Sequence, residues 1–197
     1  KEITRMGKLS SENVDNSMEA FLNNGASLIE SVTEQEKLIN FLQREVTDFM
    51  VSLSNTNLSE QQSDLITSLF HVVSDMERIG DHAKNIIELT ELKINENIQF
   101  SDKAIADIKD LYKITKEAVD TMISAFSTFD FKLAKEVIEL EGKIDTVEKR
   151  FRKDHIDRLN NRICSPAGGA IFVDLLSNFE RIGDHSNNVA QMILDQD

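Results

Sequence analysis

The chain has 197 residues, of which 40 % are hydrophobic and 29 % are charged, the balance of a globular protein rather than of a disordered one. One proline and seven glycines leave few helix breakers, and 35 acidic against 22 basic side chains give a formal net charge of −13. This charge argues against nucleic-acid binding, the single cysteine excludes an internal disulfide, and no apolar run is long enough for a membrane-spanning helix.

Helical patterns follow one another along the chain. The first half predicts a short opening helix and then helices near residues 27–54 and 59–94, the last with a capping-box spacing at Ser59 and Gln62. Residues 95–100 form the only plausible connector. In the second half we expect helices from about 101 to 127, from 131 to about 162, and from Ser165-Pro166 to about 194. The middle one has an apolar stripe at helical spacing, which consists of Leu133, Val137, Leu140, Ile144, Val147, Phe151 and Ile156.

A hexapeptide occurs twice. Residues 77–82, Glu-Arg-Ile-Gly-Asp-His, recur letter for letter at residues 180–185, an offset of 103 residues. Upstream, residues 20–21 match residues 125–126 at an offset of 105. Collinear matches of this kind indicate an internal duplication. We therefore predict an all-α fold of two antiparallel three-helix-bundle repeats, residues 1–94 and 101–197, which either stay separate or merge into one six-helix body.

Pairs of acids spaced four residues apart mark the helices of both repeats. Such residues share one helix face, where like charges repel by a few tenths of a kcal/mol unless a cation intervenes. Glu141 and Asp145 form one pair, and Glu180 and Asp184 form another. Both pairs lie about 26 Å from the turn at Ile163, so an antiparallel hairpin brings the four acids to one level. This register predicts a site for one or more hard or borderline metal ions.

The first repeat has a weaker version of this pattern. Its predicted ligands are Glu77, Asp81, Glu36 and Asn40, so one anionic ligand is replaced by an amide and we expect weaker or altered metal binding. Three further polar residues are predicted to support the ligands, namely Asn85, Asn188 and Glu148. The alternative is a solvated acidic surface neutralised by Arg78, Arg181 and Lys143.

Histidine and glycine accompany the acids in each hexapeptide. His82 and His185 directly follow an aspartate, and adjacent helical residues point about 100° apart, so we expect them to cap, edge the core or support a site rather than ligate. Gly80 and Gly183 each cost about 1 kcal/mol inside a helix. They indicate either close helix packing or room for a metal, water or ligand.

The doubled pattern resembles the PhoU family, whose hallmark is an acid-x-x-x-Asp pentad on helices of two three-helix repeats. Residues 77–81, 141–145 and 180–184 fit the pentad, and Asn40 departs from it at the last position of residues 36–40. The resemblance implies multinuclear clusters of iron or zinc on the bundle surface, with manganese or magnesium as other candidates.

The resemblance also implies a role in negative regulation of phosphate import, through contacts with the membrane domain of a phosphate transporter and with a sensor kinase. Residues 1–7 look like the segment that enters the C-terminal cytoplasmic domain of a bacterial sodium-dependent phosphate cotransporter, so we expect a membrane protein's domain on the cytoplasmic side. A homodimer is a further expectation. The alternatives are a stand-alone PhoU regulator and a metal-free helical adaptor. We expect no enzyme, because the chain has neither a recognised catalytic motif nor the Glu-x-x-His spacing of di-metal bundles.

Overall fold

A computed structural model describes residues 1–195, and this part of the chain folds into six α-helices without a strand. In chain order these are α1 (Glu2–Asn23), α2 (Ala26–Ser54), α3 (Glu60–Asn95), α4 (Asp102–Thr128), α5 (Phe131–Asn160) and α6 (Pro166–Leu194). The predicted all-α fold is confirmed, and the last two residues of the second predicted repeat, 196–197, lie outside the described residues. Among the described helices none is long and apolar enough to cross a membrane.

The helices begin where the capping residues predict. The Ser59 hydroxyl accepts a hydrogen bond from the Gln62 N–H while the Gln62 side chain accepts one from the Ser59 N–H, which is the predicted capping box. Ser101 caps α4, and Ser165 caps α6 ahead of Pro166. Each cap satisfies a first-turn donor that lacks an intrahelical acceptor.

Helix α5 ends earlier than predicted, at Asn160 instead of about residue 162. Arg162 adopts a left-handed conformation with φ of 57°, and the Ile163 N–H then bonds back to the Arg158 carbonyl at 2.9 Å. This arrangement satisfies a terminal carbonyl and stops the helix, although the apolar spacing alone would allow it to continue.

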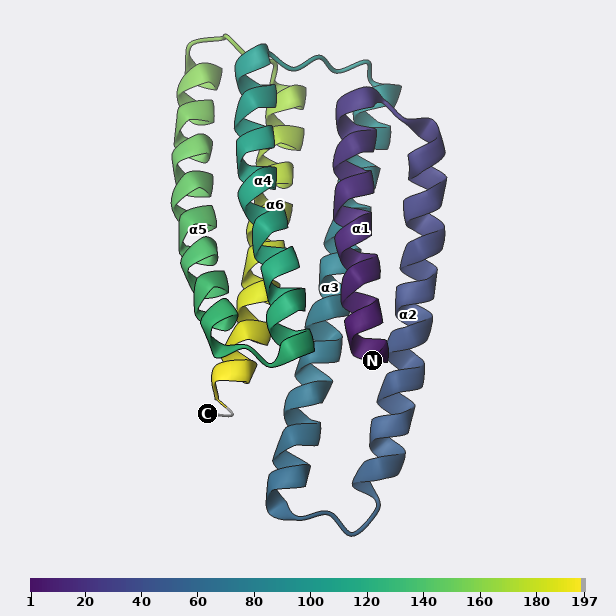
Figure 1. Cartoon of the computed structure of the whole chain (residues 1–197). Helices are drawn as coiled ribbons and strands as arrows, with labels where there is room; N and C mark the ends of the chain where they lie inside the picture. The colour runs from purple at the N-terminus through teal and green to yellow at the C-terminus, as the bar shows by residue number, and fades with distance from the viewer. Residues whose placement is uncertain (196–197) are drawn as a thin grey trace.

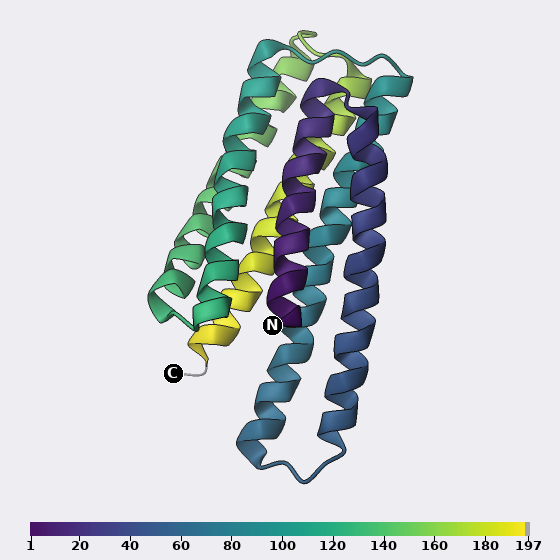
Figure 2. The same ribbon diagram turned by 45° about the vertical axis from the view of Figure 1, so that its right-hand side comes forward.

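The two halves merge into one six-helix body. Helix α3 packs on α6 and α1 packs on α4, and one hydrophobic cluster takes residues from both halves, including Phe21, Met76, Leu111 and Phe172. Figures 1 and 2 show helices whose axes are roughly aligned and whose directions alternate along the chain, with α2 and α5 on opposite flanks. The site-bearing helix pairs are therefore braced by a shared core.

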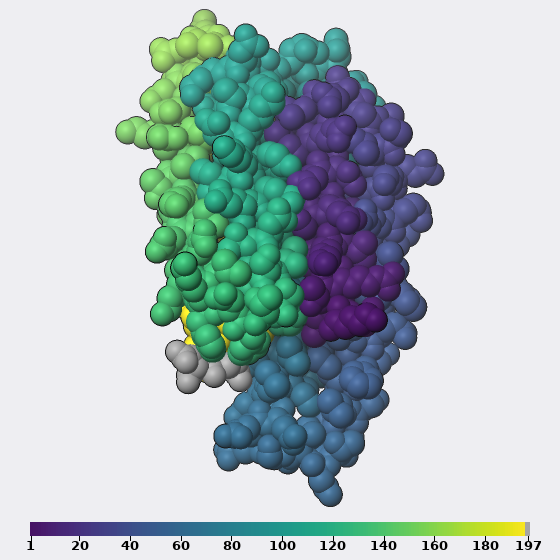
Figure 3. Space-filling model, viewed as in Figure 1, coloured from purple at the N-terminus to yellow at the C-terminus, as the bar shows by residue number. Residues whose placement is uncertain are grey.

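The ends of the two long hairpins differ. In the space-filling view the α2–α3 end projects beyond α1, whereas α4 spans the length of its own half (Figure 3). The turn between α5 and α6 meets the connector and the start of α4, because Phe100, Ser101, Ala104, Cys164 and Ser165 line one small cavity. The second half thus has a covered end that the first half lacks.

One predicted core residue lies on the wrong face. Ile156 is 49 % exposed, and His155 takes the inward position with 2 % exposure. The physical reason is helical geometry, because position 155 is four residues after Phe151 and shares its face, whereas position 156 is rotated away by about 100°. The inward residue on this part of α5 is therefore polar.

Candidate metal centre

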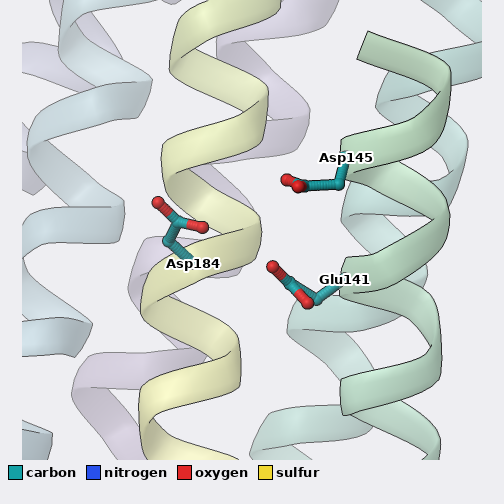
Figure 4. A group of neighbouring side chains, drawn as sticks. All are labelled: Glu141, Asp145 and Asp184. Atoms are coloured by element: carbon teal, nitrogen blue, oxygen red, sulfur yellow. The ribbon is translucent and has the colours of Figure 1, made fainter. Parts of the chain in front are cut away.

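Three carboxylates meet on the surface between α5 and α6. Glu141 and Asp145 lie one turn apart on α5, and Asp184 faces them from the antiparallel helix α6 (Figure 4). Each offers an oxygen atom within 4.8 Å of the others, and all three side chains are half-buried. The geometry therefore brings together three of the four acids that the hairpin register placed at one level.

Glu180, the fourth predicted ligand of this half, lies outside the three-acid group. It precedes Asp184 by one turn of α6, and Arg181 lies 3.7 Å from its carboxylate and 3.8 Å from that of Asp184. Burial raises the pKa of Glu180, and the charge on Asp184 raises it further, whereas Arg181 lowers it. Glu180 therefore contributes negative charge at the edge of the group.

The electrostatics of the group are those of crowded like charges. Burial raises the pKa of Glu141, and the neighbouring charges of Asp145 and Asp184 add to the rise, while Lys149 opposes it. Lys149 donates to Asp145 at 2.6 Å from an exposed position. A single exposed lysine offsets only part of the repulsion, and a divalent cation with oxygen preference would offset more of it.

The corresponding face of the first half joins α2 and α3. The Asn40 side-chain N–H donates to Glu36, and the Asn40 Oδ1 atom is buried without a hydrogen-bond partner. Burial raises the pKa of both Glu77 and Asp81; their mutual repulsion adds to the Glu77 rise, and the charge of Glu36 to that of Asp81. Across the described residues, a group of three close acidic ligands occurs only in the second half. The weaker site expected in the first half thus stays a prediction, with one buried amide oxygen free to take part.

The duplicated halves have a counterpart in a known protein family. The model of the family described as the PhoU domain matches twice, at residues 3–90 and 108–193. The chain belongs to the PhoU family. Similar relatives include "Phosphate-specific transport system accessory protein PhoU homolog 1" of Thermotoga maritima, 26 % identical over 98 % of this chain and 83 % of its own length. The PhoU homolog of Pseudomonas aeruginosa is 25 % identical over 96 % of this chain and 78 % of its own length.

Two solved PhoU structures share the fold. That of Pseudomonas aeruginosa PhoU superposes with a TM-score of 0.91 at 23 % identity, covering 98 % of this chain and 92 % of that one. The phosphate transport system regulatory protein PhoU of Streptococcus pneumoniae gives 0.84 at 19 % identity, covering 98 % of this chain and 90 % of that one. The six-helix arrangement of this PhoU chain is therefore that of two crystal structures.

Two of the predicted supporting residues bond elsewhere. The Asn85 and Asn188 side chains do not donate to the aspartates one turn before them; they reach across the α3–α6 interface to Asn178 at 3.2 Å and to Asp75 at 3.0 Å. Helical spacing gave the correct face, but the opposite helix offers an acceptor there. Glu148, the third, is buried and bonded by Arg152 at 2.6 Å, and its charge raises the pKa of nearby Glu180.

The hexapeptide histidines stack on each other where α3 meets α6, and both are half-buried. The rings of His82 and His185 are 5.5 Å apart at 28°. Nδ1 of His82 lies 2.9 Å from Asn178 Oδ1, and Nδ1 of His185 lies 2.8 Å from Asp75 Oδ1. Both Nδ1 atoms thus have partners on the opposite helix, and the expectation that the histidines support a site rather than ligate stays a prediction. Asp75 and Asn178 were missed, although each precedes its half's histidine by seven residues, two turns along the same face.

The hexapeptide glycines allow close helix packing. A Cβ on Gly80 would lie 3.0 Å from Cδ1 of Ile39, and one on Gly183 would lie 3.0 Å from Cδ1 of Ile144. The two isoleucines are related by the repeat offset of 105. Both glycines therefore fit the interpretation as close helix packing. Their contacts with the isoleucines set how closely the acid-bearing helices approach each other.

Proposed function

We propose that this chain is a non-catalytic PhoU regulator of phosphate transport that binds a metal ion on its α5–α6 face and acts by contacting a phosphate transporter. The PhoU homologs of Thermotoga maritima and Pseudomonas aeruginosa, whose names describe them as accessory proteins of phosphate-specific transport systems, support this proposal. This chain spans 83 % and 78 % of their lengths. Because these relatives are named as PhoU accessory proteins, they support the regulator of phosphate transport better than the cotransporter domain.

The observation that carries the metal part of the proposal is the approach of three carboxylates to within 4.8 Å of one another. Glu141, Asp145 and Asp184 offer oxygen atoms only, which suits iron, manganese or magnesium, and zinc also accepts carboxylates. A bound cation would supply positive charge that joins α5 to α6 and would remove the repulsion that adds to the effect of burial on the pKa of Glu141.

Metal content tests the first part. Protein purified without chelator is analysed by mass spectrometry, with an Asp145→Asn/Asp184→Asn variant beside it. Asp174→Asn is the matched control, because Asp174 is an exposed acid on α6 outside the group. We expect a stoichiometric metal in the wild type and the control and its loss in the variant. Equal metal content in all three proteins would remove this site from the proposal.

Phosphate uptake tests the regulatory part. Cells that lack the chain are complemented with the wild type, the double variant or the Asp174→Asn control, and uptake of labelled phosphate is measured in high-phosphate medium. We expect uptake to rise without the chain and to fall again with the wild type and the control. Unchanged uptake in the deletion would refute regulation, whereas full repression by a metal-free double variant would leave a helical adaptor that needs no metal.

A further inference from the structure

The covered end of the second half contains a cavity that neither the carboxylate group nor the helix packing explains. It has a volume of about 110 Å³ and lies between the first turns of α4 and α6. Ser101 and Ser165, the capping residues of these helices, both line it, as do His155 and Cys164. Two helix N-termini that meet at one cavity direct two partial positive charges toward it.

A buried, unpartnered side chain lines the same cavity. His155 is 2 % exposed, and neither of its ring nitrogens has a hydrogen-bond partner. Its ring stacks on Phe172 with centroids 4.5 Å apart, and a Cβ on Gly169 would lie only 2.9 Å from its Nε2 atom. A buried polar group without a hydrogen-bond partner is unfavourable, so an occupant that accepts a hydrogen bond from His155 would stabilise this arrangement.

Arg158 adds a second set of unpaired donors one turn further along α5. Its guanidinium lies 5.4 Å from the same Phe172 ring, and its Nε and Nη2 atoms are buried without partners. Nη1 donates to the buried Asp107 at 3.1 Å, and Lys103 donates to the other oxygen of Asp107 at 2.6 Å. Two cations therefore face one carboxylate, and one of them, Arg158, shares the Phe172 ring with His155.

The first half shows that the fold does not require these polar groups. At the repeat offset of 105, His155 corresponds to Met50, which is buried at 4 % exposure, and Arg158 corresponds to Leu53. An apolar side chain thus fills the same inward position of the duplicated hairpin. Leu53 is 39 % exposed, so the comparison concerns position 155: packing there does not require a histidine.

We propose that this cavity binds a small tetrahedral oxyanion of the inorganic phosphate class. The hydroxyl groups of Ser101 and Ser165 and the imidazole N–H of His155 donate to it, and Arg158, which packs on the same Phe172 ring as His155, supplies positive charge. The Gly168 N–H is bonded to the Ser165 hydroxyl at 3.1 Å and the Ala104 N–H to the Ser101 hydroxyl at 3.3 Å, so the two serine O–H groups are the donors left at these helix ends. The cavity is too small for a nucleotide or a lipid headgroup with its glycerol. The inference is independent of the metal and transport proposals.

Amide spectra of the labelled protein test the site directly. Inorganic phosphate, sulfate, glycerol phosphate and chloride are titrated separately at constant ionic strength. We expect saturable shifts with inorganic phosphate at residues 101–104 and 164–169, with a Kd on the order of 1 mM, and none with chloride. Saturation by glycerol phosphate with equal affinity would indicate a surface site for phosphate esters and overturn the enclosed cavity, and equal shifts with chloride would overturn oxyanion binding.

Variants with the residues of the first half remove the donors, and circular dichroism checks that each one folds, because Arg158→Leu leaves the buried Asp107 without its guanidinium partner. His155→Met and Arg158→Leu each install the residue of the equivalent position, and His71→Met is the control because His71 is exposed on α3. We expect at least a tenfold weaker phosphate affinity in each cavity variant and no change in the control. Unchanged affinity in both cavity variants would refute the assignment.

Alkylation of the single cysteine gives a readout that needs no variant. Cys164 lines the cavity and is half-buried, so an occupant should slow its reaction with iodoacetamide, a neutral reagent. We expect phosphate to slow the reaction severalfold in the native chain. No protection by phosphate, or protection by Zn²⁺ alone, would overturn the proposal, the latter in favour of a histidine–cysteine metal site.

Discussion

Replacing Asp184 by asparagine should have opposite effects on the stability of the metal-free and the metal-loaded protein. The substitution keeps the shape of the side chain and removes one of the three charges that lie within 4.8 Å of one another. In the metal-free protein this change relieves repulsion, so the free energy of unfolding should rise. In the loaded protein it removes a ligand, so the stabilisation by the ion should fall.

The expected size follows from the distances. Two unit charges 4.8 Å apart interact by about 0.9 kcal/mol at the dielectric constant of water, and Asp184 has two such neighbours. The side chain is 35 % exposed, and Arg181 lies 3.8 Å away, so screening and the lost ion pair reduce the sum. We expect a net gain of about 0.5–1 kcal/mol, which corresponds to roughly 1–4 °C in Tm for a chain of this size.

Thermal unfolding monitored by circular dichroism at low ionic strength measures both effects. Chelator-treated wild type, Asp184→Asn and the control Asp174→Asn are compared with and without added Mn²⁺. An ion at a hundred times its Kd stabilises by about 2.7 kcal/mol, which is readily seen as a shift in Tm. If Asp184→Asn lowers the Tm of the metal-free protein, or if Mn²⁺ raises the Tm of wild type and variant equally, the carboxylates are not a strained cation site.

Three further results are expected. The pKa is raised for Glu77, Asp81, Glu141 and Glu180, so the stability they contribute is complete below the pKa values of the unfolded chain and is lost as the pH rises through those of the folded chain. In urea unfolding, a variant with all four acids as amides should therefore gain in stability over the metal-free wild type from about pH 4 to pH 7. A difference that stays constant with pH would contradict the raised pKa values. A Cβ at position 142 has no atom within 4 Å, so Gly142→Ala should stabilise the helix by about 1 kcal/mol. A Cβ at position 183 lies close to Ile144, so Gly183→Ala should lose that gain unless Ile144→Val is made with it. Additive effects of the two substitutions in a double-mutant cycle would show that this contact has no influence. Asp107→Ala leaves Arg158 buried without its carboxylate and should cost about 3–5 kcal/mol in urea unfolding, and a cost near zero would mean that the cation reaches solvent.

The elements that could be predicted from the sequence are those fixed by regular helix geometry. The repeat offset and the capping serines located the helices to within about two residues, because caps and left-handed ends are local. The equal distance of Glu141, Asp145 and Asp184 from the α5–α6 turn was predictable, because the rise per residue is constant along both helices of an antiparallel hairpin. These predictions needed no knowledge of which side chains touch.

Side-chain partners across helices were not predictable in the same way. Asn188 lies one turn after Asp184 and could serve it, but the rotation of α6 against α3 places the Asp75 carboxylate within 3.0 Å of its amide. The apolar spacing of α5 favours Ile156 over His155, because an apolar side chain is the usual sign of an inward position. A polar residue that faces inward carries no such sign in its own half; comparison with Met50 of the other half supplies it.

The stacked histidines at the α3–α6 interface have an evolutionary consequence. Each contact there occurs twice at an offset of 103: His82 with Asn178, and His185 with Asp75, the counterpart of Asn178. Reciprocal pairs of this kind are the signature of an isologous two-fold interface between identical chains. A three-helix ancestor that paired with its own copy would have formed them from one gene. Fusion of two copies then allowed each side to mutate alone, and the aspartate on one side with the asparagine on the other is a difference that a homodimer could never have shown.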